Sequence, residues 1–321
     1  MLQDWIRPEH VAAWAGLTNR LAVVDDTAEF YEAEDLAEEL EEPGVDPERD
    51  TLGLWDNETM IGFGQLRLGE RLRDSRGRVS IGGGIAPEYR RRGHGSAIMD
   101  ALEFRAAAKM AERHPGTDYT IEMWGNAPGH SAGAMAVARG YEAARYFQDM
   151  SVAPAGFRPQ VRPASGPEDV RLVSYSPGLS ESVRILDNEA FADHWGSTPQ
   201  SVEEWVAMTG ARSFRGGHSR VLLETVGGTP PATALCYVLA SEWAPREMYI
   251  SRVGTARAFR GRGFAAWALS AAVQGAFAAG FTKVDLAVDA QSPTGAAGLY
   301  RLLGFEPVRQ RTMYRKTVPG R

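Results

Sequence analysis

The chain has 321 residues, of which 44% are hydrophobic and 24% charged, and its formal net charge is −6. Globular domains usually contain ~100–150 residues, so this length predicts two domains, and the composition excludes an intrinsically disordered chain. The single cysteine, Cys236, excludes a disulfide framework and a cysteine-rich zinc site. Six scattered histidines predict no metal site. The acidic balance argues against nucleic acid as the main partner.

Targeting and membrane signals are not expected in this sequence. Residues 1–7 lack a basic region followed by an apolar run, which a signal peptide would need. The longest apolar stretch, 265–281, is rich in alanine and contains Gln274 and two glycines, so it predicts a buried helix rather than a membrane span. We therefore expect a cytoplasmic protein without a membrane partner.

The first distinctive segment is acidic and runs from Asp25 to Asp50, with Arg49 as its one basic residue. Leu36 and Leu40 recur at helical spacing, which favours a helix with a solvated charged face. A second interpretation is that the acidic side chains attract polyamine-like or aminoglycoside-like acceptors.

A series of elements follows that the chain later repeats. A strand-like run, 78–81, leads to a glycine-rich basic loop that ends at Gly95, and residues 96–113 predict a helix. Residues 119–124 predict another strand, and a short helix ends at Gly140-Tyr141.

The second copy of this series lies about 165 residues further along the chain. Its parts are a strand-like run at 248–251, a loop ending at Ala265, a helix over 264–279, a strand over 283–288 and the pair Gly304-Phe305. Two copies of one α/β domain are therefore expected, as residues 1–155 and 168–321. The proline-rich stretch 156–167 is expected to link them.

Each repeated loop has the design of an anion site. The first N–H groups of a helix lack intrahelical partners, the helix dipole favours negative charge there, and glycine allows close approach of a phosphate. The candidate residues are Arg90, Arg91, Arg92, Gly93, His94 and Gly95 in the first copy, and Arg260, Gly261, Arg262, Gly263, Phe264 and Ala265 in the second. The arginines add charge that can hold phosphates.

Three other interpretations of these loops fit the sequence less well. A solvated surface turn would not explain two copies in matched context. The pattern Gly261-x-Gly263-x-x-Ala266, with Asp285 downstream, suggests a dinucleotide site. However, no hydrophobic strand end precedes these glycines, and the first copy has Ile98 where this motif requires Gly or Ala. A Walker P-loop is excluded because no G-K-[ST] sequence occurs.

Both loops resemble the acyl-CoA pyrophosphate loop of the GCN5-related N-acetyltransferases, whose signature is R/Q-x-x-G-x-G/A. The later segment Leu299-Tyr300-Arg-Leu-Leu-Gly304-Phe305 is also typical of that family. The resemblance covers nearly the whole chain, and the tandem arrangement is similar to mycothiol synthase-like two-domain acetyltransferases of actinobacteria. It implies two α/β domains, each with a mixed, mostly antiparallel, splayed sheet flanked by helices.

The resemblance also implies the chemistry. Such enzymes transfer an acetyl group from acetyl-CoA to the primary amine of a small molecule by direct attack in a ternary complex. The oxyanion donor would be a backbone N–H among Val253, Gly254 and Thr255, and Tyr300 would protonate the leaving thiolate. Ala136 stands opposite Tyr300 in the first copy, so catalysis is expected in the C-terminal domain. The alternative is a non-catalytic CoA-binding or scaffold protein with two degenerate domains.

The general base and the acceptor site are less defined by the sequence. Glu247, the candidate base, and Tyr249, a candidate substrate-binding residue, lie two positions apart in the strand, so their side chains could both face the cleft. Tyr249 rather than Glu247 fills the position that matches the family's base. Asp285 and Asp289 are alternative bases. The run Asp193-His194-Trp195 is expected to bind the acceptor, with His194 able to take the amine proton. A helix end with a core tryptophan is the competing interpretation, and the oligomeric state is left open.

Overall fold

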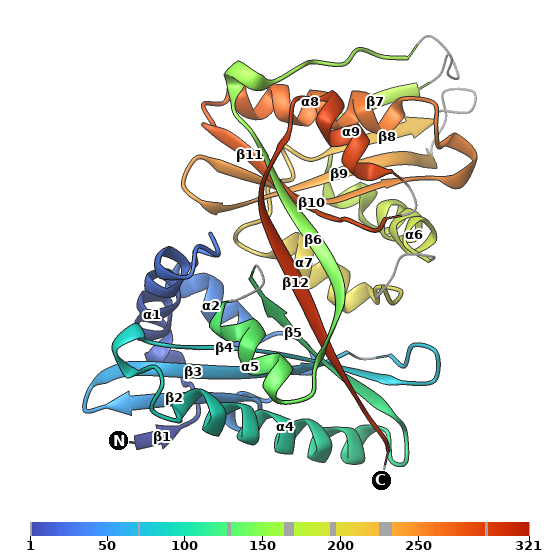
Figure 1. Ribbon diagram of the computed structural model, residues 1–321. Coiled ribbons are helices and arrows are strands. Elements are labelled where there is room, and N and C mark those ends of the chain that lie inside the picture. The colour runs from blue at the N-terminus through green and yellow to red at the C-terminus, as the bar shows by residue number, and fades with distance from the viewer. Residues whose placement is uncertain are drawn as a thin grey trace. The chain divides into compact units, whose positions relative to one another are not determined.

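The computed structural model describes residues 2–69, 71–126, 130–163, 170–192, 197–224, 233–292 and 295–320. The chain folds into two compact units (Figure 1). Unit 1 comprises Met1–Tyr146 and Gln310–Arg321, and unit 2 comprises Phe147–Arg309.

Unit 1 contains a sheet in the order β1-β2-β3-β4-β5-β12, in which only the β4–β5 pair is parallel. Its strands are β1 (Leu2–Asp4), β2 (Thr51–Asp56), β3 (Thr59–Leu68), β4 (Gly77–Ile85), β5 (Tyr119–Gly125) and the second part of β12 (Glu306–Val318). Its helices are α1 (Val11–Val24), α2 (Ala33–Leu40), α3 (Pro47–Asp50), α4 (His94–Arg113) and α5 (Ser131–Ala138).

Unit 2 has the same plan, with the strand order β6-β11-β10-β9-β8-β7 and a parallel β10–β11 pair. Its strands are the second part of β6 (Glu142–Val152), β7 (Val170–Ser174), β8 (Arg220–Glu224), β9 (Thr233–Ala244), β10 (Glu247–Thr255) and β11 (Lys283–Asp289). Its helices are α6 (Ser180–Ala190), α7 (Val202–Gly210), α8 (Phe264–Ala278) and α9 (Ala296–Leu302). The expected mixed, mostly antiparallel sheets are confirmed.

The central parallel strands of each unit separate at one end. The pairing of β4 with β5 extends to Ile81 and Met123, although β4 continues to Ile85. The pairing of β10 with β11 extends to Ile250 and Leu286, although β10 continues to Thr255. Each sheet therefore opens into a V beside the loop that precedes α4 or α8.

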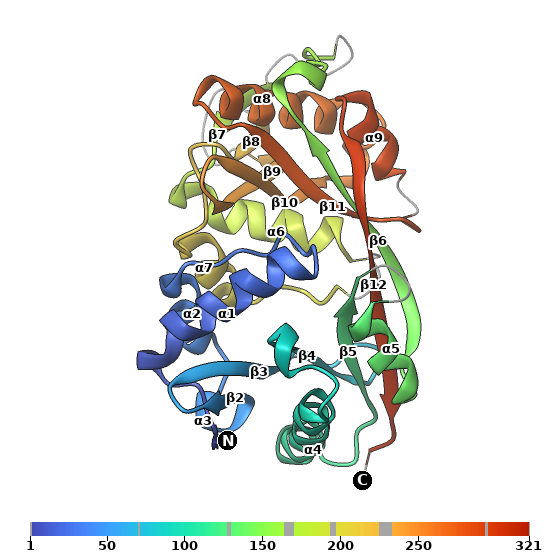
Figure 2. The same ribbon diagram turned by 60° about the vertical axis from the view of Figure 1, so that its left-hand side comes forward.

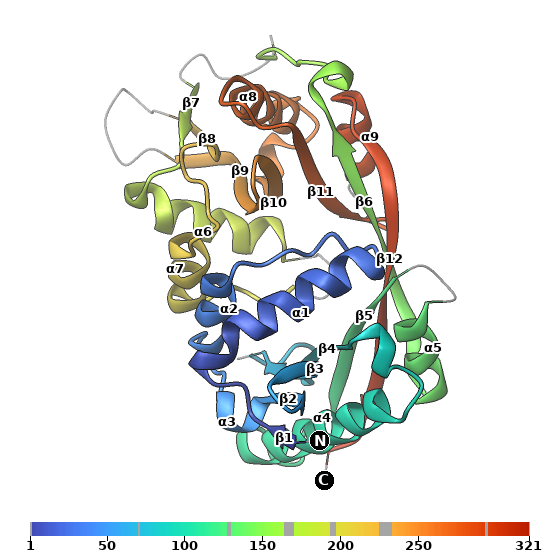
Figure 3. The ribbon, with the colours of Figure 1, turned by 90° about the vertical axis from the view of Figure 1, so that its left-hand side faces the viewer.

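Helices cover both faces of each sheet. In unit 1, α4 packs on one face over a core that includes Ile98 and Leu102, while α1 and α2 pack on the other (Figure 2). In unit 2, α8 covers one face and α6 and α7 cover the other (Figure 3). The buried Leu36 and Leu40 on α2 confirm a helix with a solvated acidic face in the segment 25–50. Among the described helices, none is long and apolar enough to span a bilayer.

The two units exchange their last strands. Residues Phe147–Val152 of β6 follow the first repeat but pair with β11 of unit 2. Residues Thr312–Val318 of β12 follow the second repeat but pair with β5 of unit 1. The boundaries of the units therefore lie inside β6 and β12, whereas the linker expected at 156–167 begins in unit 2 and its residues 164–167 lie outside the described residues.

Candidate functional site

The two repeats can be aligned through hydrogen bonds that recur in both. The amide of Phe305 donates to the carbonyl of Tyr300, as that of Tyr141 donates to Ala136. The side chain of Asn188 bonds both the N–H and the C=O of Gln200 (2.7 and 3.1 Å), and Asn19 does the same to Tyr31 (2.8 and 2.9 Å). These pairs define matched positions in the two repeats.

The loop before α8 has the backbone that an anion site needs. After β10 the chain makes a 3₁₀ turn at Arg257–Phe259, and Gly261 and Gly263 then adopt positive φ of 72° and 80°. Gly263 is the N-cap of α8, so the amides of the first helical turn point outward without intrahelical partners. The loop is exposed from Arg260 to Gly263.

Unit 1 forms the same turn, but with an arginine where unit 2 has a glycine at positive φ. Its 3₁₀ turn covers Pro87–Tyr89, and Gly93 caps α4 with φ of 87°. Arg91 stands where Gly261 stands in unit 2 and adopts φ of 61°. A residue with a Cβ is disfavoured in this region, so the first copy holds the loop at a conformational cost.

The first arginine of each loop supports the turn. The Nε of Arg260 donates to the carbonyl of Thr255 (3.2 Å) and its Nη2 to that of Ala190 (3.0 Å). The Nε of Arg90 donates to the carbonyl of Ile85 (2.8 Å), and its two Nη groups bind the carboxylate of Asp25 (2.8 and 2.6 Å). Both arginines thus tie the loop to the strand end and to the C-terminal end of a helix on the other face of the sheet, α6 for Arg260 and α1 for Arg90.

The second feature that both loops share is an arginine over an aromatic ring. The guanidinium of Arg262 lies 5.1 Å from the centre of the Phe259 ring, and that of Arg92 lies 5.4 Å from the Tyr89 ring. Both arginines are exposed beside the first helical turn. Arg262 and Arg92 are therefore better placed than Arg260 and Arg90 to meet an anion there.

Only one of the two central strands carries a β-bulge. The register of β10 against β9 shifts between Ile250 and Arg252, leaving Ser251 as the extra residue. The register of β4 against β3 is regular from Gly62↔Ile85 to Leu68↔Val79. A bulge re-aims the groups that follow it and is frequent next to active sites. In unit 2, those groups are Val253, Gly254 and Thr255.

A buried ionic cluster lies directly beside this bulge, and sequence reasoning did not identify it. The Nε and Nη2 of Arg252 bind the two carboxylate oxygens of Asp187, each at 2.7 Å, and the hydroxyl of Tyr237 donates to the same carboxylate. Asp187 is 1% exposed and Tyr237 fully buried, while the side chain of Arg252 is 22% exposed. Arg252 also lies over the ring of Phe191 on its α6 side.

The charges in this cluster stabilise one another. Burial would lower the pKa of Arg252, but the adjacent Asp187 carboxylate reverses the effect and holds that pKa above its usual value. Burial, assisted by the same carboxylate, raises the pKa of Tyr237 well above its usual value. The cluster ties α6 to β9 and β10, and the ring of Tyr237 leaves no room for a side chain at Gly254, where a Cβ would lie 2.4 Å from Cε1.

Unit 1 has none of these groups at the matched positions. Asn19 matches Asn188 by its hydrogen bonds, and Gly84 matches Gly254 by strand register. On this alignment Thr18 corresponds to Asp187, Phe63 to Tyr237 and Gly82 to Arg252. The hydroxyl of Thr18 is buried and has no hydrogen-bond partner among the described residues. The signal for this cluster in the sequence was a charged residue, Arg252, within the strand that precedes the loop.

Tyr300 lies on α9 and packs into the core of unit 2. It is 8% exposed, its ring meets that of Phe305 edge-on at 6.0 Å, and burial, followed by the effect of Tyr249, raises its pKa to about 12. The matched Ala136 is fully buried in unit 1.

The structure places Glu247 in a cluster at the far end of the strand. Lys283 lies 3.0 Å from Glu247 and 3.0 Å from Asp285. Glu247 precedes Val253 by six residues, roughly 20 Å along an extended strand. An ionic cluster also occupies the matched place in unit 1, where Arg78 and Arg315 bind Glu122. Glu247 and the oxyanion candidates are thus not brought together.

The remaining expected site residues are only partly described. Tyr249 stacks on Trp243, with ring centres 4.1 Å apart. Asp289 is 6% exposed and accepts the amide of Gln291 at 2.8 Å. Asp193, His194 and Trp195 lie outside the described residues.

Comparison with known proteins finds the same family in both repeats. The model of the acetyltransferase (GNAT) family matches residues 9–125 and 181–305. Mycothiol acetyltransferase of Clavibacter sepedonicus is 27% identical over 235 residues, covering 72% of this chain and 71% of the relative. Mycothiol acetyltransferase of Kineococcus radiotolerans is 28% identical, with 69% and 67% covered.

Two solved structures share the fold over the whole chain. A GCN5-related N-acetyltransferase from Sphaerobacter thermophilus matches with a TM-score of 0.76 and 22% identity, covering 99% of this chain and 96% of that chain. A tandem GNAT protein from the clavulanic acid biosynthesis pathway matches with a TM-score of 0.70 and 16% identity, covering 100% and 99%. Both likenesses support two similar units in tandem.

Proposed function

Because the chain belongs to the acetyltransferase (GNAT) family and is an N-acetyltransferase, we propose that it acetylates the primary amine of a small molecule with acetyl-CoA, and that catalysis takes place in unit 2. The contrast between the two repeats carries this proposal. At matched positions unit 2 has Tyr300, a bulged β10 and a buried ion pair, whereas unit 1 has Ala136, a regular β4 and a glycine at Gly82.

The residues of the unit 2 loop fit the pyrophosphate of acetyl-CoA. The outward amides of residues 264–266 supply donors, Gly261 and Gly263 allow close approach, and Arg262 adds an exposed charge. Acetyl-CoA would supply an acetyl group activated as a thioester. The V between β10 and β11 gives the pantetheine arm a path to the backbone at Val253.

The chemical step is a direct acyl transfer. The neutral amine attacks the thioester carbonyl carbon, and a backbone N–H in 253–255 donates to the oxyanion that forms. The C–S bond then breaks as the carbonyl re-forms, and Tyr300 gives its proton to the departing thiolate. A pKa of about 12 keeps Tyr300 protonated at neutral pH, so its proton is available.

We propose that the base that removes the amine proton lies outside the Glu247 cluster. Glu247 is held by Lys283 at the distant end of β10, so we propose that it has a structural role. Asp193, His194 and Trp195 stay candidates for the acceptor side, with His194 as the group able to take the proton.

A turnover assay with a panel of amines tests the proposal. Release of CoA thiol from acetyl-CoA should depend on an added primary amine, and Tyr300→Phe should lower kcat by roughly 10²-fold with little loss of thermal stability. Ala136→Val, at the matched buried position of unit 1, controls for a change of packing in the corresponding helix, α5. Amine-dependent release that is unchanged in Tyr300→Phe would reject the assigned acid, and no release with any amine would favour a non-catalytic CoA-binding protein.

A further inference from the structure

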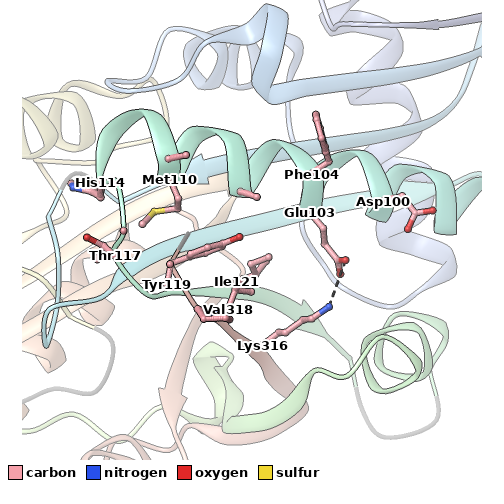
Figure 4. A pocket seen from close by; sticks show the side chains of 15 residues that line it. Asp100, Glu103, Phe104, Met110, His114, Thr117, Tyr119, Ile121, Lys316 and Val318 are labelled. Carbon is pink, nitrogen blue, oxygen red and sulfur yellow. Dashed lines mark ion pairs between the residues drawn. The ribbon is translucent and has the colours of Figure 1, made fainter.

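Unit 1 contains a cavity of about 460 Å³ between α4, β5 and the end of β12 (Figure 4). Its floor is apolar and includes Met110, Tyr119, Ile121 and Val318, and the ion pair of Glu103 with Lys316 closes one side. This cavity lies on the α4 face of the sheet and contains none of the residues assigned to acetyl transfer.

The matched groove of unit 2 is filled by the chain itself. After β6, residues 157–163 (Phe-Arg-Pro-Gln-Val-Arg-Pro) run along α8 as an extended segment, which we call the groove segment. The ring of Phe157 meets that of Phe277 edge-on at 5.6 Å. The amide of Arg158 donates to the carbonyl of Leu303 (2.9 Å), and that of Gln160 donates to the hydroxyl of Ser270 (2.8 Å).

The ends of this track are marked by two glycines in each unit. In unit 2, a Cβ on Gly304 would lie 2.0 Å from the carbonyl oxygen of Gly156, and a Cβ on Gly263 would lie 3.5 Å from Pro163. The matched glycines of unit 1 are Gly140 and Gly93, and no described atom lies within 4 Å of a Cβ built on either. As far as the described residues show, the track that is covered in unit 2 is therefore open at both ends in unit 1.

The cavity lies on this open track. On the alignment of Gly93 with Gly263, Ala107 corresponds to Phe277 and Asp100 to Ser270, and both Ala107 and Asp100 line the cavity. The smaller Ala107 leaves room for a large ring against the apolar floor. The carboxylate of Asp100, 69% exposed, is ion-paired with Arg139 and stands where the Ser270 hydroxyl accepts a backbone amide, so it offers the peptide its remaining acceptor capacity.

We propose that this cavity is a docking groove for an extended peptide segment of a partner protein, with an aromatic residue that enters beside Ala107 and basic residues near Asp100. The occupant is defined by the groove segment of unit 2, which has an aromatic residue followed by two arginines, Arg158 and Arg162. Carbonyls and a carboxylate along the track would hold the peptide backbone, and the ring would supply the apolar contact. The inference does not depend on the proposed acetyl transfer.

Peptide binding to the full-length protein tests the inference. The probe is a fluorescein-labelled peptide with the sequence of residues 153–163, Ala-Pro-Ala-Gly-Phe-Arg-Pro-Gln-Val-Arg-Pro. Its anisotropy should rise saturably, and replacing its phenylalanine with alanine should weaken binding by ~10-fold or more. Ala107→Trp should abolish binding by filling the cavity, whereas Ala12→Trp, at an exposed alanine of α1, should leave binding unchanged.

A second variant guards against a local packing change in Ala107→Trp. Asp100→Lys alters an exposed side chain and should weaken the peptide several-fold, because a cation replaces the acceptor and repels the arginines of the peptide. Arg139 loses Asp100 in this variant but keeps Glu103 as a partner. Absence of saturable binding would overturn the inference. Equal binding to Ala107→Trp and Ala12→Trp would also overturn it, because the peptide would then bind elsewhere, for example by displacing the groove segment of unit 2.

Discussion

The ionic cluster beside the β10 bulge allows a quantitative prediction. Replacing Asp187 with asparagine removes the charge that neutralises Arg252 but retains the shape of the side chain. Arg252 would then be left as a largely buried cation without its counterion, and one carboxylate acceptor of the Tyr237 hydroxyl would be weakened.

The expected cost follows from the geometry. Removal of one partner from a buried ion pair typically costs ~3–5 kcal/mol, and the 22% exposure of Arg252 places the expectation near the lower bound, at about 3 kcal/mol. Replacing the whole cluster with apolar groups of similar shape, as Asp187→Leu, Tyr237→Phe and Arg252→Met together, should cost less than Asp187→Asn alone, because no charge is left unpaired.

Urea unfolding, followed by a probe in unit 2, measures both values. Thr18→Ala at the matched position of unit 1 is the control, and it should change stability by less than about 0.5 kcal/mol because the Thr18 hydroxyl has no partner among the described residues. A triple variant that is less stable than Asp187→Asn would refute the reasoning, since the cluster would then be a net source of stability.

Three further predictions concern single side chains. Arg91→Gly should raise the unfolding free energy by up to about 1 kcal/mol in thermal or urea unfolding, because it relieves a positive φ; a loss of stability would contradict the strain argument. Glu247→Gln should leave kcat within about twofold in the acetyl-transfer assay, and a large loss would restore it as a base. Burial raises the pKa of Glu39 to about 7. The protonated Glu39 carboxyl therefore contributes to the free energy of unfolding fully below pH 4.5, and this contribution is lost as pH rises through 7. Glu39→Gln should therefore stabilise unit 1 at pH 8, by on the order of 1 kcal/mol, but not at pH 4; equal effects at both values would contradict it.

Local patterns in the sequence predicted the parts of the fold that depend on nearby residues. The repeated loop predicted a strand, a turn with positive φ and a helix, and both copies have this geometry at Gly93 and Gly263. The spacing to Gly140 and Gly304 placed Ala136 opposite Tyr300, and the same backbone hydrogen bonds in both repeats support this alignment.

The features that sequence reasoning missed depend on distant partners. Asp187 lies 50 residues from Tyr237 and 65 from Arg252, so no local spacing links them. The exchange of β6 and β12 between the units follows from strand pairing over more than 130 residues, which periodicity does not reveal. Arg260 was expected to hold a phosphate, but strand-end and helix carbonyls are within reach of its side chain.

The division of labour between the two loops is tested most directly by one matched comparison. Arg262→Glu and Arg92→Glu make the same charge reversal at corresponding exposed arginines, each beside a helix N-terminus and an aromatic ring. The measurement is kcat/KM for acetyl-CoA with an amine that the protein accepts. We expect a loss of ~10-fold or more in Arg262→Glu and less than twofold in Arg92→Glu. Equal losses, or a larger loss in Arg92→Glu, would contradict catalysis in unit 2.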